Sequence, residues 1–166
     1  MEEILEILEK NSKYNEEEIA AMIGKTVEEV KTAIKQYEEE NVIVGYTTMI
    51  NWEKTSKESV IALIEVRVTP QRGEGFDKVA ERIYRFPEVK ACYLMSGGFD
   101  LTVIIEGKSI KEVSLFVSEK LATQECVLST ATHFVLKKYK DKGTIFEEKI
   151  RDDREAIFIW WLRIWF

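Results

Sequence analysis

Three lysines and three hydrogen-bonding side chains lie close together near the start of the chain: Lys25, Thr26, Lys31, Thr32, Lys35 and Gln36. Lysine ammonium groups bind phosphates, while Thr and Gln side chains reach the edges of bases. In a helix, Lys31 and Lys35 are neighbours on one side. The set therefore predicts recognition of nucleic acid, provided that the segment folds as a helix that presents it.

Residues suited to catalysis or metal binding are few. The single histidine, His133, lies between Thr132 and Phe134 in an expected strand, a position typical of a structural imidazole. Cys92 and Cys126 lack the C-x-x-C spacing of a zinc site or a disulfide framework. The sequence shows no nucleophile with a neighbouring base. We therefore expect no enzymatic activity, no cofactor and no metal.

The segment from Asn15 to Glu40 has the pattern of two short helices joined by a tight turn. Asn15 can cap a helix on which Ile19, Met22 and Ile23 share a face, and Gly24 allows the chain to reverse. Thr26 and Glu29 have the spacing of a capping box for a second helix. We expect the buried side of that helix to carry Val27, Val30, Ile34 and Tyr37. With a first helix over Glu2–Lys10, the segment predicts a helix-turn-helix of the kind that enters the major groove.

The charge of this segment opposes DNA binding. Residues 1–50 contain five lysines and twelve glutamates, a net charge of −7, whereas residues 51–166 carry +1 and the whole chain −6. Affinity for duplex DNA depends strongly on cations that replace condensed counterions. We expect each helix to bind DNA weakly and with strong sensitivity to salt.

The remainder of the chain alternates strand and helix patterns. Strands are expected at Val60–Thr69, Val89–Met95, Leu101–Glu106 and Val127–Tyr139, with helices at Phe76–Ile83 and after a Ser109/Glu112 capping box. This order predicts an α+β protein: an N-terminal three-helix helix-turn-helix unit plus a ferredoxin-like βαββαβ sheet domain. A β-branched stretch, Val42–Ile50, predicts a strand that links the two.

These patterns give the domain boundaries. We expect a helix-turn-helix domain with its linking strand at 1–50, a hinge at 51–59, a ferredoxin-like domain for ligand binding and dimerisation at 60–140, and a tail at 141–166. The tail is charged and then aromatic. Three interpretations stay open for it: an interface strand, a membrane-surface anchor, and a segment without selected function. Its apolar run, Ile157–Leu162, is too short to cross a bilayer.

The first strand of the sheet domain has apolar residues on both faces. Ile61 and Leu63 alternate with the residues expected to face the helices. A sheet with helices on one side only leaves such residues exposed unless another surface covers them. We interpret them as a homodimer interface; isolated exposed aliphatic residues are the alternative.

Two motifs resemble a known family. Asn41–Thr47 matches the pattern G-x-I-x-G-Y-T from its third position, and Ser96–Asp100 matches S-G-x-[FY]-D, both typical of the Lrp/AsnC family of leucine-responsive regulators. The resemblance extends over about Ile4 to Tyr139. It implies sheet domains that dimerise, dimers that join into tetramers or octamers, and an amino acid bound between dimers at the Ser96–Asp100 hairpin.

The resemblance also implies roles for single residues. Gly97 and Gly98 would let backbone N–H groups approach a ligand carboxylate, next to Phe99, and Asp100 would accept from its ammonium group. Thr130 and Thr132 would lie near the ligand. The alternatives are an ordinary hairpin turn for the glycines and plain β propensity for the threonines.

We therefore expect a cytoplasmic, DNA-binding transcriptional regulator that responds to an amino acid or a related small molecule. The alternative is an amino-acid-sensing oligomer whose degenerate helix-turn-helix contacts protein instead of DNA.

Overall fold

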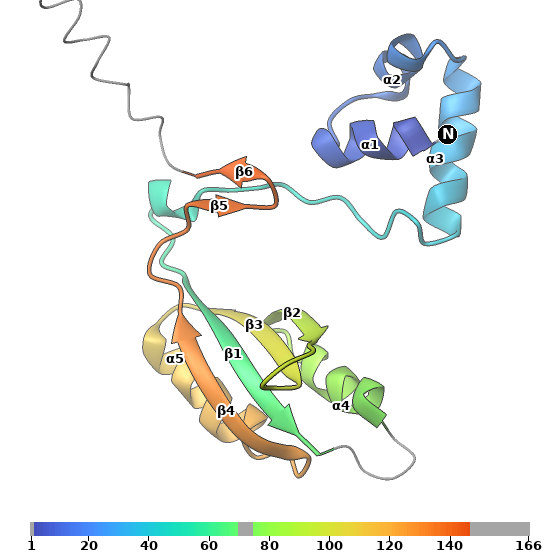
Figure 1. Cartoon of the computed structure of the whole chain (residues 1–166). Helices are drawn as coiled ribbons and strands as arrows, with labels where there is room; N and C mark the ends of the chain where they lie inside the picture. Colours follow the sequence, from blue (N-terminus) through green and yellow to red (C-terminus); the bar gives the residue numbers. More distant parts are fainter. Residues whose placement is uncertain (1, 70–74, 147–166) are drawn as a thin grey trace, which may run out of the picture. The chain divides into compact units, whose positions relative to one another are not determined.

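The computed structural model describes residues 2–69 and 75–146, and the chain divides into two compact units, Met1–Ile50 and Asn51–Phe166. The first unit contains three helices: α1 at Glu2–Lys10, α2 at Glu16–Ile23 and α3 at Val27–Glu39 (Figure 1). Its core consists of one set of small and branched side chains: Ile4, Leu8, Ile19, Ala20, Val30 and Ala33.

Capping residues define both ends of the turn between α2 and α3. The Asn15 side chain accepts from the Glu18 N–H at 2.8 Å, and the Glu18 carboxylate accepts from the Asn15 N–H at 2.9 Å. Gly24 ends α2 at φ 66°, the left-handed region that glycine adopts at little cost. Thr26 and Glu29 form the capping box that their spacing predicts. Local chemistry is thus sufficient to place this turn.

Two of the predicted buried positions in the helices are wrong. Met22 is 53% exposed and Val27 is 39% exposed. Ala20 and Ala33 are buried in the same core instead. Periodicity predicts the buried side of a helix only approximately, because residues at its edge fit the same period. The packing of α2 against α3 decides which of them is covered.

The linking strand predicted at Val42–Ile50 is not formed. Asn41 has φ 56°, and the Tyr37 carbonyl accepts from the N–H groups of Val42 and Ile43 at 2.8 and 3.0 Å, so this chain segment first closes the end of α3. No strand in the described part of the chain pairs with residues 44–50. A β-branched sequence forms a strand only where a partner completes its hydrogen bonds.

The second unit is built on a four-stranded antiparallel sheet. Its elements follow the order β1 (Val60–Val68), α4 (Gly75–Tyr84), β2 (Val89–Leu94), β3 (Leu101–Gly107), α5 (Ile110–Phe116) and β4 (Val127–Phe134), and the strand order is β2-β3-β1-β4. A π-helical turn at Val117–Leu121 continues α5. The α+β fold class with a βαββαβ order is confirmed.

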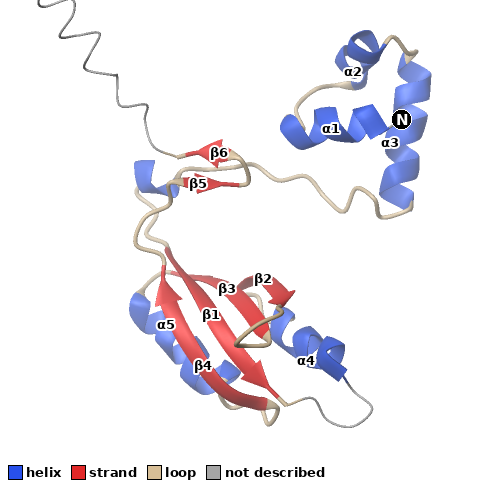
Figure 2. Ribbon diagram, viewed as in Figure 1, coloured by secondary structure: helices blue, strands red, loops and turns tan. Residues whose placement is uncertain are grey.

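Both helices cover the same face of this sheet (Figure 2). On β1, the residues facing them are fully buried: Ala62, Ile64 and Val66. They pair with Ile105, Val103 and Leu101 of β3, which are also buried. Val79 and Ile83 of α4 and Val113 and Phe116 of α5 complete this core. The period-2 alternation of β1 therefore sets which face is covered.

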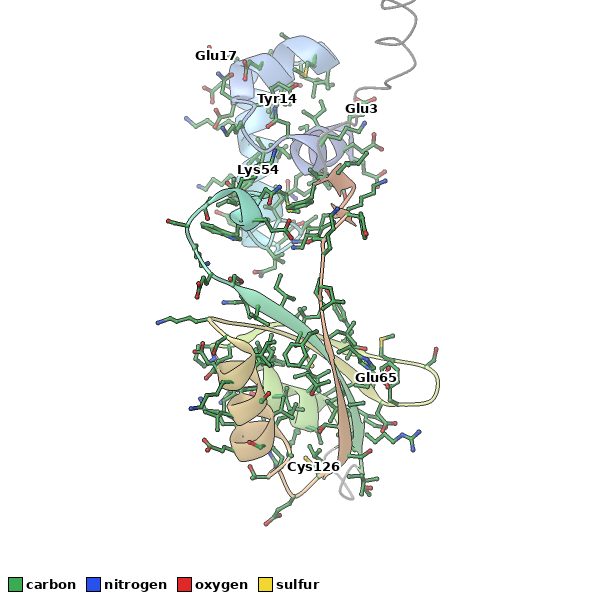
Figure 3. The ribbon with its side chains drawn as sticks, turned by 90° about the vertical axis from the view of Figure 1, so that its left-hand side faces the viewer. Glu3, Tyr14, Glu17, Lys54, Glu65 and Cys126 are labelled. Carbon is green, nitrogen blue, oxygen red and sulfur yellow. The ribbon has the colours of Figure 1, made fainter. Side chains whose placement is uncertain are left out.

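Ile61 and Leu63 lie on the opposite face of β1 and are partly exposed. Figure 3 shows Glu65, which shares their face, on the side of the sheet away from α5. Leu63 pairs with Ile104 of β3 and His133 of β4. The face without helices is thus part apolar and part polar, and its assignment to a dimer interface stays a prediction.

The last strand is shorter than predicted. β4 ends at Phe134, not at Tyr139, because it pairs antiparallel with β1 and reaches the start of β1 there: Phe134 pairs with Ala62, and the Val135 N–H donates to the Ile61 carbonyl. A small hairpin follows, with β5 at Lys140–Asp141 and β6 at Thr144–Ile145. The sequence predicts a charged stretch there, whereas the left-handed Lys142 and Gly143 make a turn.

Residues 51–59, the predicted hinge, contact the sheet unit. Trp52–Lys54 is a 3-10 turn, and the Asn51 side chain donates to the Phe146 carbonyl at 3.2 Å. The Ser59 hydroxyl and the Lys57 ammonium bind the Glu106 carboxylate at 2.8 and 3.2 Å. These contacts attach the segment to β3. Residues 147–166, including the aromatic tail, lie outside the described residues.

Candidate functional site

Two surfaces carry the predicted site residues, the first of which is the exposed side of α3. All six predicted DNA-binding residues, Lys25, Thr26, Lys31, Thr32, Lys35 and Gln36, are exposed. The capped turn at Gly24–Thr26 fixes where α3 begins, and burial of Val30 and Ala33 turns the opposite side of the helix to solvent. The structure therefore presents these residues together on one unit.

The six residues differ in the hydrogen bonds and ion pairs that their side chains form within the chain. In the part of the chain that the structure describes, Lys31 and Thr32 form no side-chain hydrogen bond or ion pair. Thr26 is committed to the helix end: its hydroxyl accepts from the Glu29 N–H at 3.3 Å and donates to the Glu29 carboxylate at 2.8 Å. Bonds from the Thr26 N–H and hydroxyl hold the pKa of Glu29 below its ordinary value, with a smaller contribution from Lys25. Thr26 therefore acts in the first place as a cap.

Lys35 and Gln36 are engaged by the last turn of their own helix. The Lys35 ammonium lies 3.7 Å from the Glu39 carboxylate, and the Gln36 amide donates to Glu40 at 2.8 Å. Both Lys35 and Glu39 are largely exposed, so water and salt screen the ion pair. Sequence reasoning missed these contacts, although the i, i+4 spacing could have indicated them.

Tyr46 of the G-Y-T motif forms a hydrogen bond with the same helix, α3. Its hydroxyl donates to the Glu38 carboxylate at 2.9 Å. Partial burial raises the pKa of the Tyr46 phenol, and the bond to Glu38 adds to the rise. Tyr46 thus ties the segment after α3 to the C-terminal turn of α3, within the first unit.

The second surface is the hairpin between β2 and β3, which the Asp100 main chain and side chain attach to β1. The Asp100 carbonyl accepts from the Met95 N–H at 2.8 Å, and the Asp100 N–H donates to the Val66 carbonyl at 3.1 Å. The Asp100 carboxylate accepts from the Val68 N–H at 2.9 Å. The sequence did not indicate this bond, because its partner is a main-chain group about thirty residues away. Asp100 therefore has a structural task in addition to any ligand contact.

Open space surrounds the two glycines of this hairpin. A Cβ added at Gly97 or at Gly98 would meet no atom within 4 Å. Gly97 has φ 150°, a conformation that side chains disfavour, while Gly98 is in an ordinary one. Phe99 beside them is partly buried. Packing within the chain thus does not require glycine at position 98, which leaves its backbone accessible from outside.

Thr130 and Thr132 lie elsewhere in the sheet. They pair with Val66 and Ile64, so they face the helix-covered side of β4 and are partly buried. The strand order places β1 between β4 and β3, which puts about 10 Å between the two backbones. Within one chain, the structure does not bring these threonines together with the hairpin.

On the face without helices, a pair of polar residues accompanies Ile61 and Leu63. The His133 Nε2 atom lies 3.3 Å from the Glu65 carboxylate, and both side chains are partly exposed. His133 is thus held by a carboxylate on the neighbouring strand, which agrees with a structural imidazole.

A hollow of about 300 Å³ lies beside α5 in the sheet unit, and its lining residues do not include those of the hairpin. Lys120 at its wall forms an ion pair with Glu88 at 2.5 Å, which lowers the pKa of that carboxyl. The Lys120 ammonium also lies 5.8 Å from the ring centres of Phe86 and Phe116. Its cation is thus already engaged, and we assign no ligand to this hollow.

Among the described residues, no group of three or more His, Cys, Asp or Glu side chains could hold a metal ion. No described helix combines the length and the apolar character that a membrane crossing requires.

A helix-turn-helix followed by a βαββαβ domain defines a class of two-domain transcriptional regulators. The family model for the Lrp/AsnC ligand binding domain matches residues 61–145. The HTH-type transcriptional regulator YugG of Bacillus subtilis is 56% identical over 156 residues, which cover 93% of this chain and 94% of YugG. The chain belongs to the Lrp/AsnC family, and it is an HTH-type transcriptional regulator.

Solved structures agree on the fold. A transcriptional regulator from Neisseria meningitidis in complex with L-Met superimposes with a TM-score of 0.69 at 22% identity, covering 84% of this chain and 89% of that one. E. coli AsnC gives a TM-score of 0.66 at 19% identity, covering 87% and 94%. The resemblance and the fold class predicted from the sequence are confirmed.

Proposed function

We propose that the chain binds duplex DNA through the exposed side of α3. Lys31 and Thr32 are the principal contacts, because they are exposed and have no partner in the described part of the chain. Lys25 and Lys35 add phosphate contacts, and Gln36 reaches base edges. Thr26 contributes by fixing the start of the helix. The availability of Lys31 and Thr32 in the second turn of a capped helix is the observation that carries this proposal.

The charge of the first unit limits the strength of this contact. With a net charge of −7 over residues 1–50, few phosphates are neutralised per helix. A homodimer, and a tetramer or octamer built from dimers, presents several copies of α3 and gains affinity through avidity. We propose that dimerisation uses the face of Ile61 and Leu63, and that the regulator acts in the cytoplasm without catalysing a reaction.

Titration of labelled promoter DNA tests the DNA-binding role. We expect binding at about 50 mM salt and a steep loss by about 200 mM. Lys31→Ala should lower the salt slope by about one ion, and Lys111→Ala, at an exposed position of α5 in the sheet unit, serves as the matched control. Absence of binding by the wild-type chain at the lower salt concentration would leave the alternative function: a sensing oligomer whose helices contact protein.

We further propose that an amino acid binds at the Gly97–Asp100 hairpin. The related Neisseria regulator was solved with L-Met, and the open backbone of Gly97 and Gly98 suits a carboxylate. Phe99 provides apolar contact and Asp100 a negative charge for the ammonium group. Thr130 and Thr132 lie too far away within one chain, so in this proposal they reach the ligand from a neighbouring subunit.

Thermal shift with the twenty amino acids tests this site, because a ligand that binds the native state raises the midpoint. Gly98→Ala is the sharpest variant, since its methyl group meets no atom of the chain but occupies the ligand's approach. We expect at least one amino acid to raise the midpoint of the wild type, and the shift to disappear in Gly98→Ala. An undiminished shift in that variant would place the ligand elsewhere.

A further inference from the structure

The C-terminal turn of α3 has an unusual charge for its position. Glu38, Glu39 and Glu40 follow one another there, and the last turn contains no basic residue. The helix macrodipole places partial negative charge at this end, so carboxylates are unfavourable and basic residues are favoured. Three glutamates at this end therefore reduce helix stability. Their side-chain partners indicate which interactions they make instead.

Each of the three carboxylates has one partner. Glu38 accepts from Tyr46 in the segment after the helix. Glu39 and Glu40 bind the two proposed DNA-contacting residues one turn earlier. The Glu39 carboxylate lies 3.7 Å from the Lys35 ammonium, and the Glu40 carboxylate accepts a hydrogen bond from the Gln36 amide at 2.8 Å. The two partners are a cation that suits phosphate and an amide that suits a base edge. Glu39 and Glu40 thus satisfy the same groups that DNA would satisfy.

We propose that Glu39 and Glu40 act as an internal competitor that lowers the DNA affinity of α3. A phosphate that binds Lys35 either displaces the Glu39 carboxylate or lies close to its negative charge, so the net gain per contact is small. Glu40 likewise occupies one of the two amide N–H donors of Gln36 and fixes the orientation in which the amide can meet a base. This inference rests on the proposed DNA-binding function, and it names the residues that weaken it.

The competitor is local, which separates it from the general acidity of the unit. Lys31 and Thr32, one turn nearer the start of α3, have no such partner in the described ranges and stay available. Removing the Glu39 charge therefore affects Lys35 specifically, whereas removing a distant charge changes only the mean potential. An exposed ion pair is weak, so the specific gain is expected to be modest, about two- to five-fold in affinity.

A charge-matched comparison in the full chain tests this. Glu39→Gln is compared with Glu9→Gln, which removes the same charge from the last turn of α1, where the Glu9 side chain forms no hydrogen bond or ion pair with the described residues. The probe is a fluorescein-labelled duplex of mixed sequence, titrated from about 50 to about 200 mM salt. We expect Glu39→Gln to bind about two- to five-fold tighter than Glu9→Gln, with a salt slope larger by about one ion.

Two further variants identify the groups involved. In a Lys35→Met background, the advantage of Glu39→Gln over Glu9→Gln should disappear, because the two residues act as a pair. Glu40→Gln releases a neutral amide, so it should raise affinity without the additional change in slope. Circular dichroism shows whether helix content is the same in all variants.

The outcomes decide both proposals separately. If the wild type binds and Glu39→Gln equals Glu9→Gln in affinity and slope, the competitor is refuted and DNA binding stands. If the wild type binds and Glu39→Gln binds tighter than Glu9→Gln with the larger salt slope, both the DNA-binding function and the competitor are supported. If neither binds, both the competitor and the DNA-binding function are refuted.

Discussion

The α3 surface and the β2–β3 hairpin satisfy their polar groups in different ways. On α3, exposed side chains pair with other exposed side chains: Lys35 with Glu39 and Gln36 with Glu40. At the hairpin, Asp100 binds main-chain groups of β1 through both its backbone and its carboxylate. The first arrangement can exchange its partners for DNA at low cost. The second fixes a loop whose glycines stay open, which suits a preformed small-molecule site.

The two regions also differ in how they depend on other chains. The hairpin is held by its own sheet, whereas α3 has few free cations and needs several copies for firm binding. Four changes test this contrast.

Leu63→Asp should have the largest effect on DNA binding. Placed between Ile104 and His133 in register, the carboxylate would prevent the uncovered face from packing on a second copy. We expect a monomer by light scattering and a loss of DNA affinity of about 100-fold or more, from lost avidity. Leu115→Asp makes the same change in charge at an exposed position of α5, on the helix-covered side of the sheet, and is the control. A dimer that survives Leu63→Asp would place the interface elsewhere.

Ile19→Ala should unfold the first unit and leave the second folded. Ile19 is fully buried in a small core, and its truncation costs about 2–5 kcal/mol. Calorimetry and limited proteolysis should show the N-terminal helices lost while the sheet transition is unchanged. Ile64→Ala makes the converse change in the sheet. A single transition that shifts as a whole in both variants would contradict two separately folding units.

Asp100→Ala should destabilise the sheet unit, whereas Gly98→Ala should not. The first leaves the Val68 N–H without its partner, at a cost of about 1–3 kcal/mol. The second adds a methyl group that meets no atom within 4 Å. Urea unfolding without ligand measures both. Equal stability of Asp100→Ala and the wild type would show that the carboxylate bond is dispensable.

Glu106→Gln should have the smallest effect, a change in how stability depends on pH in acid. Bonds from Ser59 and Lys57 hold the pKa of Glu106 below its ordinary value of 4.5. A carboxyl whose pKa is lower in the folded state stabilises above the unfolded pKa, and this contribution is lost as the pH falls through the folded value. Urea unfolding of Glu106→Gln should therefore show a weaker loss of stability below about pH 4.5 than the wild type. An identical acid profile would contradict the assignment.

Local chemistry accounts for what the sequence predicted well. Asn15, Gly24 and the Thr26/Glu29 box act within a few residues of themselves, so their caps and the turn between α2 and α3 followed from spacing. The alternation in Val60–Thr69 likewise gave the two faces of β1. Capping and period-2 burial depend on neighbours in sequence, which a single chain displays directly.

The features that the sequence did not predict depend on contacts between residues far apart in the chain. Val42–Ile50 has the composition of a strand, but no strand in the described ranges pairs with it, whereas the shorter segments near Lys142–Gly143 pair through their own turn. Met22 and Val27 fit the helical period, yet packing covers Ala20 and Ala33 instead. A pattern states which residues are able to be buried, and only the neighbouring elements select among them.

The order of elements, the turn that begins α3 and the family follow from the amino-acid sequence, because motifs and periodicity are properties of a single chain. Which polar groups already have a hydrogen-bond partner depends on the packing of the folded chain. Asp100 meets Val68 because β3 lies beside β1, and Thr130 and Thr132 are separated from the hairpin because β1 lies between. Hydrogen bonds between distant residues exist only once the sheet sets its strand order, so the availability of each site residue is a property of the fold.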